Sequence, residues 1–147
     1  MNVEYETMKH IEEVKKALNQ IVIYLLLKGE KHDRSKFSEE ELPSFLKYTP
    51  LLADTTYGSK QYKVFLKEMK SALKHHYKNN EHHPEYHKKG IRGMNLLDII
   101  EMLCDWKAAT KRHKNGDIRL SIIKNQKRFG YSDELKEIFL NTMSYLI

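Results

Sequence analysis

Apolar residues recur at helical spacing along most of the chain, and no stretch of useful length alternates between apolar and polar positions. Over residues 4–28 the apolar positions follow the three- and four-residue steps of an α-helix, and Gly29 predicts its end. This first apolar stripe consists of Met8, Ile11, Val14, Leu18, Ile21 and Leu25. Because a half-buried strand needs a two-residue period, the pattern predicts an all-α protein, a bundle of about five to seven helices.

Two further helices are expected in the middle of the chain. Ser38 with Glu41 matches a capping box that opens a short helix, and Pro43 favours a later start for its regular part. A loop is expected around residues 49–59, after which Ser59 caps a longer helix. The apolar stripe of this helix consists of Tyr62, Phe65, Met69, Ala72 and Leu73.

The C-terminal half predicts an irregular segment followed by three helices. Residues 78–95 are too polar and too rich in glycine and proline for a helix. From Asn95 the chain reads as a helix that is apolar around most of its circumference and closes with basic residues and Gly116. Two shorter amphipathic helices, near 118–128 and 133–146, are expected to cover the bundle.

Length and composition favour one cytoplasmic domain over residues 1–147, which is long enough to bury a core without disulfides. The chain has one cysteine, Cys104, in an apolar stretch, so a reducing compartment and a small core thiol are expected. The most apolar run, "IVIYLLL" at 21–27, is too short to span a bilayer, and no membrane association is predicted.

The net charge of +6 favours anionic partners such as nucleotides, nucleic acid or acidic proteins. On the helix that starts at Ser59, one charged face lies opposite the apolar stripe and can contact the phosphates of nucleic acid or an acidic protein surface. This lysine face consists of Lys60, Lys63, Lys67, Lys70, Lys74 and Lys78. A solvated face is the simpler interpretation, because no aromatic residues interleave with the lysines for base stacking.

Histidines are concentrated in a way that solubility does not require: five of the eight lie between residues 75 and 87. His10 is four residues before Val14 and so borders the buried face of the first helix. On the lysine-bearing helix, His76 falls in the middle of the apolar stripe, whereas His75 is turned by roughly a hundred degrees from it and should face outward.

A line of carboxylates runs along the helix that begins at Asn95. Asp98, Glu101 and Asp105 share one face, and solvent, a basic partner or a metal must satisfy them where they are buried. Taken singly, an inward histidine is more often a hydrogen-bonded core residue, and an acidic line is more often solvated. Together with the "HD" dipeptide at 32–33, they provide imidazole and carboxylate ligands suited to Mn, Fe, Co, Ni or Zn.

The order of His10, then His32 and Asp33, then Asp105 resembles the H...HD...D pattern of the HD-domain superfamily of metal-dependent phosphohydrolases. "HDRSK" resembles the HDxxK form of this motif, in which a lysine near the phosphate occupies the place of Lys36. The interval from His10 to His32 contains 21 residues, shorter than in many members of the superfamily.

The segments "HDRSKF", "HHPEYH" and "DIIEMLCDW" together resemble, over most of the chain, an uncharacterised domain family common in phages and bacteria. His76 and the "EHHPEYH" cluster also resemble the extra histidines of HD proteins that bind two metals. "HHPEY" is similar to a motif of pterin carbinolamine dehydratases as well, but those enzymes place it in a fold with strands.

The HD resemblance implies one or two divalent metal ions, from among Mn, Fe, Co, Ni, Zn and Mg, and a nucleotide, a phosphodiester or another phosphorylated small molecule as substrate. The implied ligands of one metal are His10, His32, Asp33 and Asp105, and those of a second are His76 with His82 or His83. In this hypothesis Lys36 and Arg34 hold the phosphate, and Glu101, one turn before Asp105, orients a ligand or a water. Some HD-fold proteins with two irons are oxygenases, so this chemistry and a non-enzymatic binding role remain as alternatives.

Overall fold

The computed structural model describes residues 2–56, 58–112 and 116–146. Over these residues the chain forms seven α-helices and four short 3-10 helices, without a strand. The all-α prediction is confirmed, and the number of helices lies within the predicted range. The chain divides into two compact units, Met1–His32 and Asp33–Ile147, so the prediction of one domain over 1–147 stays a prediction.

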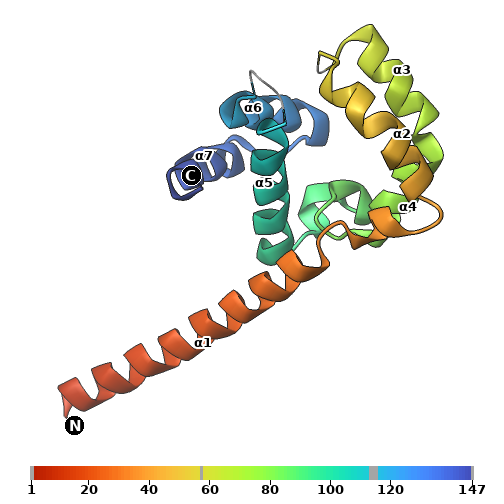
Figure 1. Cartoon of the computed structure of the whole chain (residues 1–147). Helices are drawn as coiled ribbons and strands as arrows, with labels where there is room; N and C mark the ends of the chain where they lie inside the picture. The colour runs from red at the N-terminus through yellow and green to blue at the C-terminus, as the bar shows by residue number, and fades with distance from the viewer. Residues whose placement is uncertain (1, 57, 113–115, 147) are drawn as a thin grey trace. The chain divides into compact units, whose positions relative to one another are not determined.

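The first unit is a single long helix, α1 (Val3–Lys31; Figure 1). Asn2 caps its N-terminus by accepting hydrogen bonds from the backbone amides of Glu4 and Tyr5. The expected end at Gly29 is wrong, because the helix continues to Lys31 and His32 is the capping residue. Glycine tolerates the helical conformation, and basic residues in the last turn favour the helix C-terminus, so Gly29 was a weak stop signal.

The hydrophobic core of the second unit is built by its last three helices, α5 (Leu96–Thr110), α6 (Ile118–Phe129) and α7 (Asp133–Thr142), with a final 3-10 turn, η4 (Met143–Tyr145). Helix α6 packs against both α5 and α7 (Figure 1). The buried members of this core are Met102, Leu103, Ile122, Tyr131, Phe139 and Met143. The helices expected from Asn95, near 118–128 and near 133–146 are present. Helix α5 ends at Thr110, before the expected stop at Gly116, and α7 ends at Thr142, where η4 follows.

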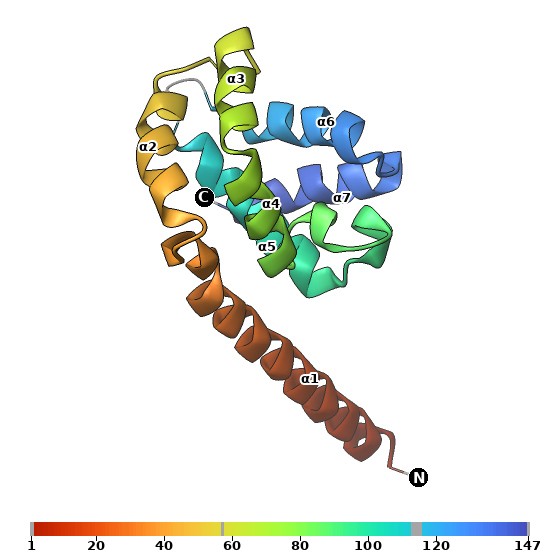
Figure 2. The same ribbon diagram turned by 90° about the vertical axis from the view of Figure 1, so that its right-hand side faces the viewer.

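Helices α2 (Leu42–Ala53), α3 (Lys60–Glu68) and α4 (Lys70–Asn79) form a second group, in which α3 contacts both α2 and α4 (Figure 2). The loop expected from residue 49 begins later, because α2 continues to Ala53 with Pro50 inside it. The single helix expected after Ser59 is interrupted at Met69, which ends α3 and precedes α4. Both differences change where a helix starts or ends and leave its apolar face in place.

Short turns connect these groups: η1 (Arg34–Phe37) follows α1, and η2 (Pro84–Tyr86) and η3 (Gly90–Gly93) lie between α4 and α5. Residues 78–95 were expected to be non-helical; α4 continues to Asn79, and residues 80–95 contain no α-helix. Turn η1 contacts α2 and α4, and α4 contacts η2. These contacts bring residues from distant parts of the sequence to the end of α4.

The structure also bears on the predictions for Cys104 and for membrane-spanning helices. Cys104 is exposed on α5, so the prediction of a core thiol is wrong: the inward side of α5 is taken by Met102 and Leu103. Among the described residues, no helix has both the length and the apolar character that a bilayer span requires.

Candidate metal centre

Asp33 begins the site in an unusual backbone conformation. It has φ 56° and ψ 13°, in the left-handed region, and it directly precedes η1. Aspartate is one of the few residues other than glycine that adopt this conformation readily. Its Oδ2 atom accepts a hydrogen bond from Lys36 Nζ, and its Oδ1 atom faces two histidines.

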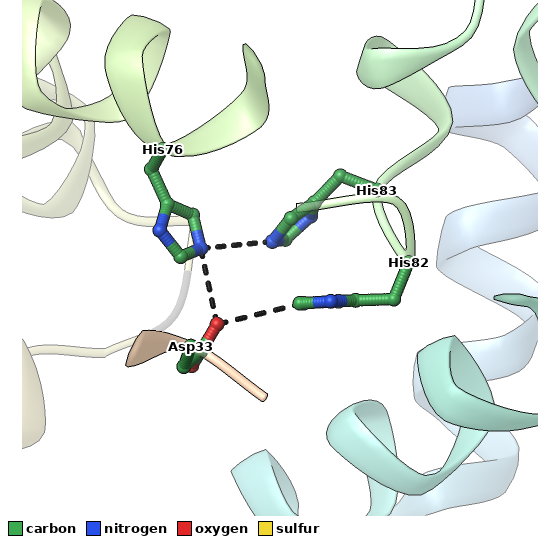
Figure 3. A group of neighbouring side chains, drawn as sticks. All are labelled: Asp33, His76, His82 and His83. Carbon is green, nitrogen blue, oxygen red and sulfur yellow. Dashed lines mark hydrogen bonds and ion pairs between the residues drawn. The ribbon is translucent and has the colours of Figure 1, made fainter. Parts of the chain in front are cut away.

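His76 reaches Asp33 from helix α4. Its side chain is only 3% exposed, and its Nε2 atom lies 3.2 Å from Asp33 Oδ1. The same nitrogen lies 3.0 Å from Nε2 of His83 (Figure 3). The helical phase of α4 therefore directs this side chain inward, as the sequence predicts.

His82 and His83 come from the turn between α4 and η2. The His82 Nε2 atom lies 3.5 Å from Asp33 Oδ1, and the two adjacent rings have centroids 4.2 Å apart. The backbone amide of His83 donates to the carbonyl of Asn80, which ties this turn to the end of α4. The sequence left open which of the two histidines joins the site, and both do (Figure 3).

One ligand atom from each of four residues lies within 4.8 Å of the others: Asp33, His76, His82 and His83. Three imidazoles and one carboxylate form a donor set typical of transition-metal sites, and such a cluster can hold a metal ion. The sequence predicts all four as metal ligands but divides them between two ions, with Asp33 at one and the histidines at the other; the structure places Asp33 with the histidines.

The environment of His83 favours its neutral form. Burial lowers its pKa to about 3, and the neighbouring His82 and His76 act in the same direction, while the charges of Asp105 and Asp33 oppose the change. A neutral imidazole keeps a lone pair for a metal ion, whereas an imidazolium has none. His83 is therefore in the protonation state of a ligand at neutral pH.

Two carboxylates lie behind the histidines, on the ring nitrogens opposite the cluster. His82 Nδ1 lies 3.2 Å from Glu101 Oε1 on α5, and His76 Nδ1 lies 2.9 Å from Glu41 Oε2. Glu101 was expected near the ligands, but Glu41 was missed. The expected capping box is wrong: Glu41 is the N-cap of α2 and makes no side-chain capping bond. Its carboxylate instead forms hydrogen bonds with His75 and His76.

A pocket of about 810 Å³ in the second unit includes Lys36, His83 and Asp105 in its wall. The Lys36 ammonium lies 5.0 Å from the centre of the Phe45 ring, which also lines the pocket. Asp105 is near enough to His83 for its charge to affect the histidine pKa. The predicted phosphate-binding lysine and the final aspartate of the motif thus share one cavity with a cluster histidine.

The geometry of the second unit does not test the roles of the remaining predicted site residues. His10 and His32 belong to the first unit, His32 as the residue that caps α1 and immediately precedes Asp33 in the chain. Arg34 is exposed on η1. His10 lies 22 positions before His32, and α1 is continuous over Val3–Lys31, so roughly 33 Å of helix separate the two residues and they cannot bind the same ion. The roles of His32 and Arg34 stay predictions.

Two histidines were left without a role. His87 Nε2 lies 2.8 Å from the carbonyl oxygen of Glu81 and 3.8 Å from Asp98 Oδ2, so His87 belongs to a neighbouring polar group. His113 lies outside the described residues.

A family model matches residues 1–145 of the chain, and its description reads "Family of unknown function (DUF5662)". The chain belongs to DUF5662. The three motifs that resemble an uncharacterised family all fall within the matched residues, so the expected membership in a family without an assigned function is confirmed. The match supports no HD-domain assignment. No curated protein and no solved structure matches the chain.

Proposed function

We propose that this protein is a metal-dependent hydrolase of phosphate esters that acts on a nucleotide or a phosphodiester. The observation that supports it most is the convergence of three histidines and Asp33, with their ligand atoms within 4.8 Å of one another. The resemblance of "HDRSK" and the later histidines and aspartate to the HD superfamily supplies the reaction type.

The residues of the cluster fit a divalent metal ion because they offer three imidazole rings and a carboxylate oxygen. A bound cation supplies Lewis-acid chemistry: it lowers the pKa of a coordinated water and neutralises charge on a phosphate oxygen. His76, His82, His83 and Asp33 would hold this ion, with His32 and Asp105 as further ligands by resemblance.

Lys36 is the residue best positioned to bind the phosphate. Its ammonium contacts Asp33 and faces the same pocket as His83, so it can donate hydrogen bonds to an anion beside the cluster. Its positive charge stabilises the negative charge that develops on the phosphate oxygens during hydrolysis. Arg34, two residues away on η1, is the second candidate for this role.

The remainder of the pocket suits a phosphorylated small molecule. Its volume of about 810 Å³ is in the range of small-molecule sites. Its wall includes the aromatic side chains of Tyr62, Tyr77 and Trp106. It also includes two basic residues of α6, Lys124 and Arg128. Aromatic rings can pack against a nucleobase, and the basic groups can bind additional phosphates.

The test combines metal analysis with an activity screen. Protein purified without chelator is expected to contain a transition metal, and with added Mn it is expected to release phosphate from a nucleotide or to cleave a phosphodiester. Asp33→Asn keeps a residue that tolerates the left-handed backbone but lacks the ligand charge, so it should lose both metal and turnover while remaining folded. Metal-free wild-type protein without turnover on a broad panel would overturn the proposal.

Nucleic-acid binding by the lysine face is an alternative function. All six residues of the lysine face are exposed on α3 and α4, as a nucleic-acid contact requires. Binding of nucleic acid with a steep salt dependence and no turnover would favour this role. Oxygen consumption by iron-loaded protein would instead favour the oxygenase alternative.

A further inference from the structure

Glu41 is a fully buried carboxylate outside the predicted site. Its side chain is 0% exposed, and each of its oxygens faces a different histidine of α4. Oε1 lies 2.8 Å from His75 Nδ1 and Oε2 lies 2.9 Å from His76 Nδ1. Glutamate is rarely buried to this extent unless it is paired, so these contacts explain its position.

We propose that Glu41 is a positioning residue for the metal ion, which holds His76 with its Nδ1 proton toward Glu41 and its Nε2 lone pair toward the cluster. This inference rests on the proposed function, because it assumes that the cluster binds a cation. Glu41 does not contact the ion or the substrate; it acts through His76.

The geometry carries this assignment. A carboxylate accepts hydrogen bonds and cannot donate them when ionised. The 2.9 Å hydrogen bond from Nδ1 to Glu41 is shorter than the 3.2 Å ion-pair contact of Nε2 with Asp33, which assigns the ring proton of His76 to Nδ1. The Nε2 atom, 3.2 Å from Asp33 Oδ1 and 3.0 Å from His83 Nε2, is then left with its lone pair directed into the cluster. Metal-binding histidines commonly have a carboxylate on the opposite nitrogen, which orients the ring and increases its basicity.

The same arrangement occurs at a second histidine. His82 has Nδ1 3.2 Å from Glu101 and Nε2 3.5 Å from Asp33. Two rings from different segments thus have a carboxylate on one nitrogen and the cluster on the other. This repetition is expected of a built metal site and is not required by packing alone.

Two other polar groups lie close to His76 Nδ1 and are alternative hydrogen-bond partners for this atom. Ser35 Oγ and Asn80 Nδ2 both lie 3.1 Å from this nitrogen. Asn80 Nδ2 also lies 2.8 Å from the His76 carbonyl oxygen and 2.7 Å from Ser35 Oγ, and these two atoms can accept its protons. The shortest contact of His76 Nδ1 is the one to the Glu41 carboxylate.

The negative charge of the Glu41 carboxylate also favours a cation at the cluster. A carboxylate removed from water is costly unless positive charge compensates it. Glu41 faces two imidazoles, and a cation bound at Nε2 of His76 would supply that charge through the ring. The burial of Glu41 is therefore easier to explain with a metal ion at the cluster than without one.

The test compares Glu41→Gln with Glu40→Gln, which changes the neighbouring exposed glutamate in the same way. Metal-free proteins are titrated with Co²⁺, and both affinity and the visible absorption spectrum of bound cobalt are recorded. Glu41→Gln is expected to weaken Co²⁺ binding by roughly 10- to 100-fold and to alter the spectrum, whereas Glu40→Gln matches wild type. Glu41→Asp, with a shorter side chain, should give an intermediate affinity.

A measurement on the wild-type protein avoids the risk that the variants fail to fold. Nitrogen NMR of labelled histidines should find His76 protonated on Nδ1, with the metal-induced shift on Nε2. Protonation on Nε2 in the metal-free protein, or a metal-induced shift on Nδ1, would overturn the inference. Equal Co²⁺ affinity of folded Glu41→Gln and wild type would overturn it and leave the metal site intact, whereas wild-type protein that binds no metal would overturn the proposed function with it.

Discussion

Adjacent histidines on α4 have different environments because one residue step along a helix turns the side chain by roughly a hundred degrees. His76 is 3% exposed and reaches Asp33, whereas the His75 side chain is 35% exposed and bonds to Glu41. His76→Ala should therefore abolish or strongly weaken metal binding. His75→Ala should have a smaller effect, which arises through Glu41.

Metal stoichiometry and Co²⁺ affinity of the two variants, measured beside wild type, check this order. Circular dichroism serves as the control for folding. Equal losses in both variants would mean that His75 is a ligand as well.

For Asp105, replacing the carboxylate by an amide tests whether the residue is a metal ligand. Asp105→Asn keeps the size of the side chain but removes the charge that a divalent cation needs. If the aspartate is a ligand, as the HD resemblance implies, the increase in melting temperature caused by metal should be lost. If it is only a neighbour of His83, the substitution should change stability by a few tenths of a kcal/mol, as at an ordinary surface position.

Melting temperatures of wild type and Asp105→Asn, each with and without chelator, discriminate these cases. An unchanged chelator effect in the variant would remove Asp105 from the site, and with it much of the HD resemblance.

At the scale of elements, α5 both completes the core and presents Glu101 and Asp105. Its start is defined by a capping box: Asn95 Oδ1 accepts from the backbone amides of Leu97 and Asp98, and the Asp98 side chain accepts from the amide of Asn95. This arrangement holds the first turn of the helix and accounts for the burial of Asp98.

Asn95→Ala should lower the free energy of unfolding by about 1 kcal/mol, because it removes the acceptor of two backbone amides. Urea unfolding measures this change. Asn141→Ala, at an exposed position of α7, is the matched control and should stay within about 0.5 kcal/mol of wild type. A loss of similar size in both variants would contradict the role of the cap.

For the whole molecule, the lowered pKa of His83 predicts sensitivity to acid. Burial lowers the pKa of His83 to about 3, from the 6.5 of an exposed histidine. Between these two values the unfolded chain binds a proton that the folded protein does not, so stability decreases as the pH falls from about 6.5 toward 3.

Melting temperatures of the metal-free protein between these pH values measure this dependence, and His83→Gln should reduce the slope. The charged and titratable groups that face His83 are His82, His76, Asp105 and Asp33. An identical slope in His83→Gln would show that His83 does not titrate as described.

The order of helices and the inward phase of His76 could be predicted because both follow from residues three and four positions apart, whose relation is set by helix geometry. The same local reasoning placed Asp98, Glu101 and Asp105 on one face of α5 and recognised Asn95 as its start. It failed at Gly29, which remained helical, and at Glu41, whose carboxylate contacts two histidines of α4 and does not form a capping box.

The composition of the cluster depends on contacts between residues far apart in the chain. Glu41 lies 35 positions before His76, and Asn80 lies 45 positions after Ser35. No helical period relates such residues, so their proximity arises only when η1, α2 and α4 pack together. Packing likewise brought both His82 and His83 to Asp33, an alternative that the motif left open. The types of ligand are therefore encoded locally, whereas the carboxylates that orient them are selected by the tertiary fold, because a buried charge takes whichever polar partners packing places within hydrogen-bonding distance.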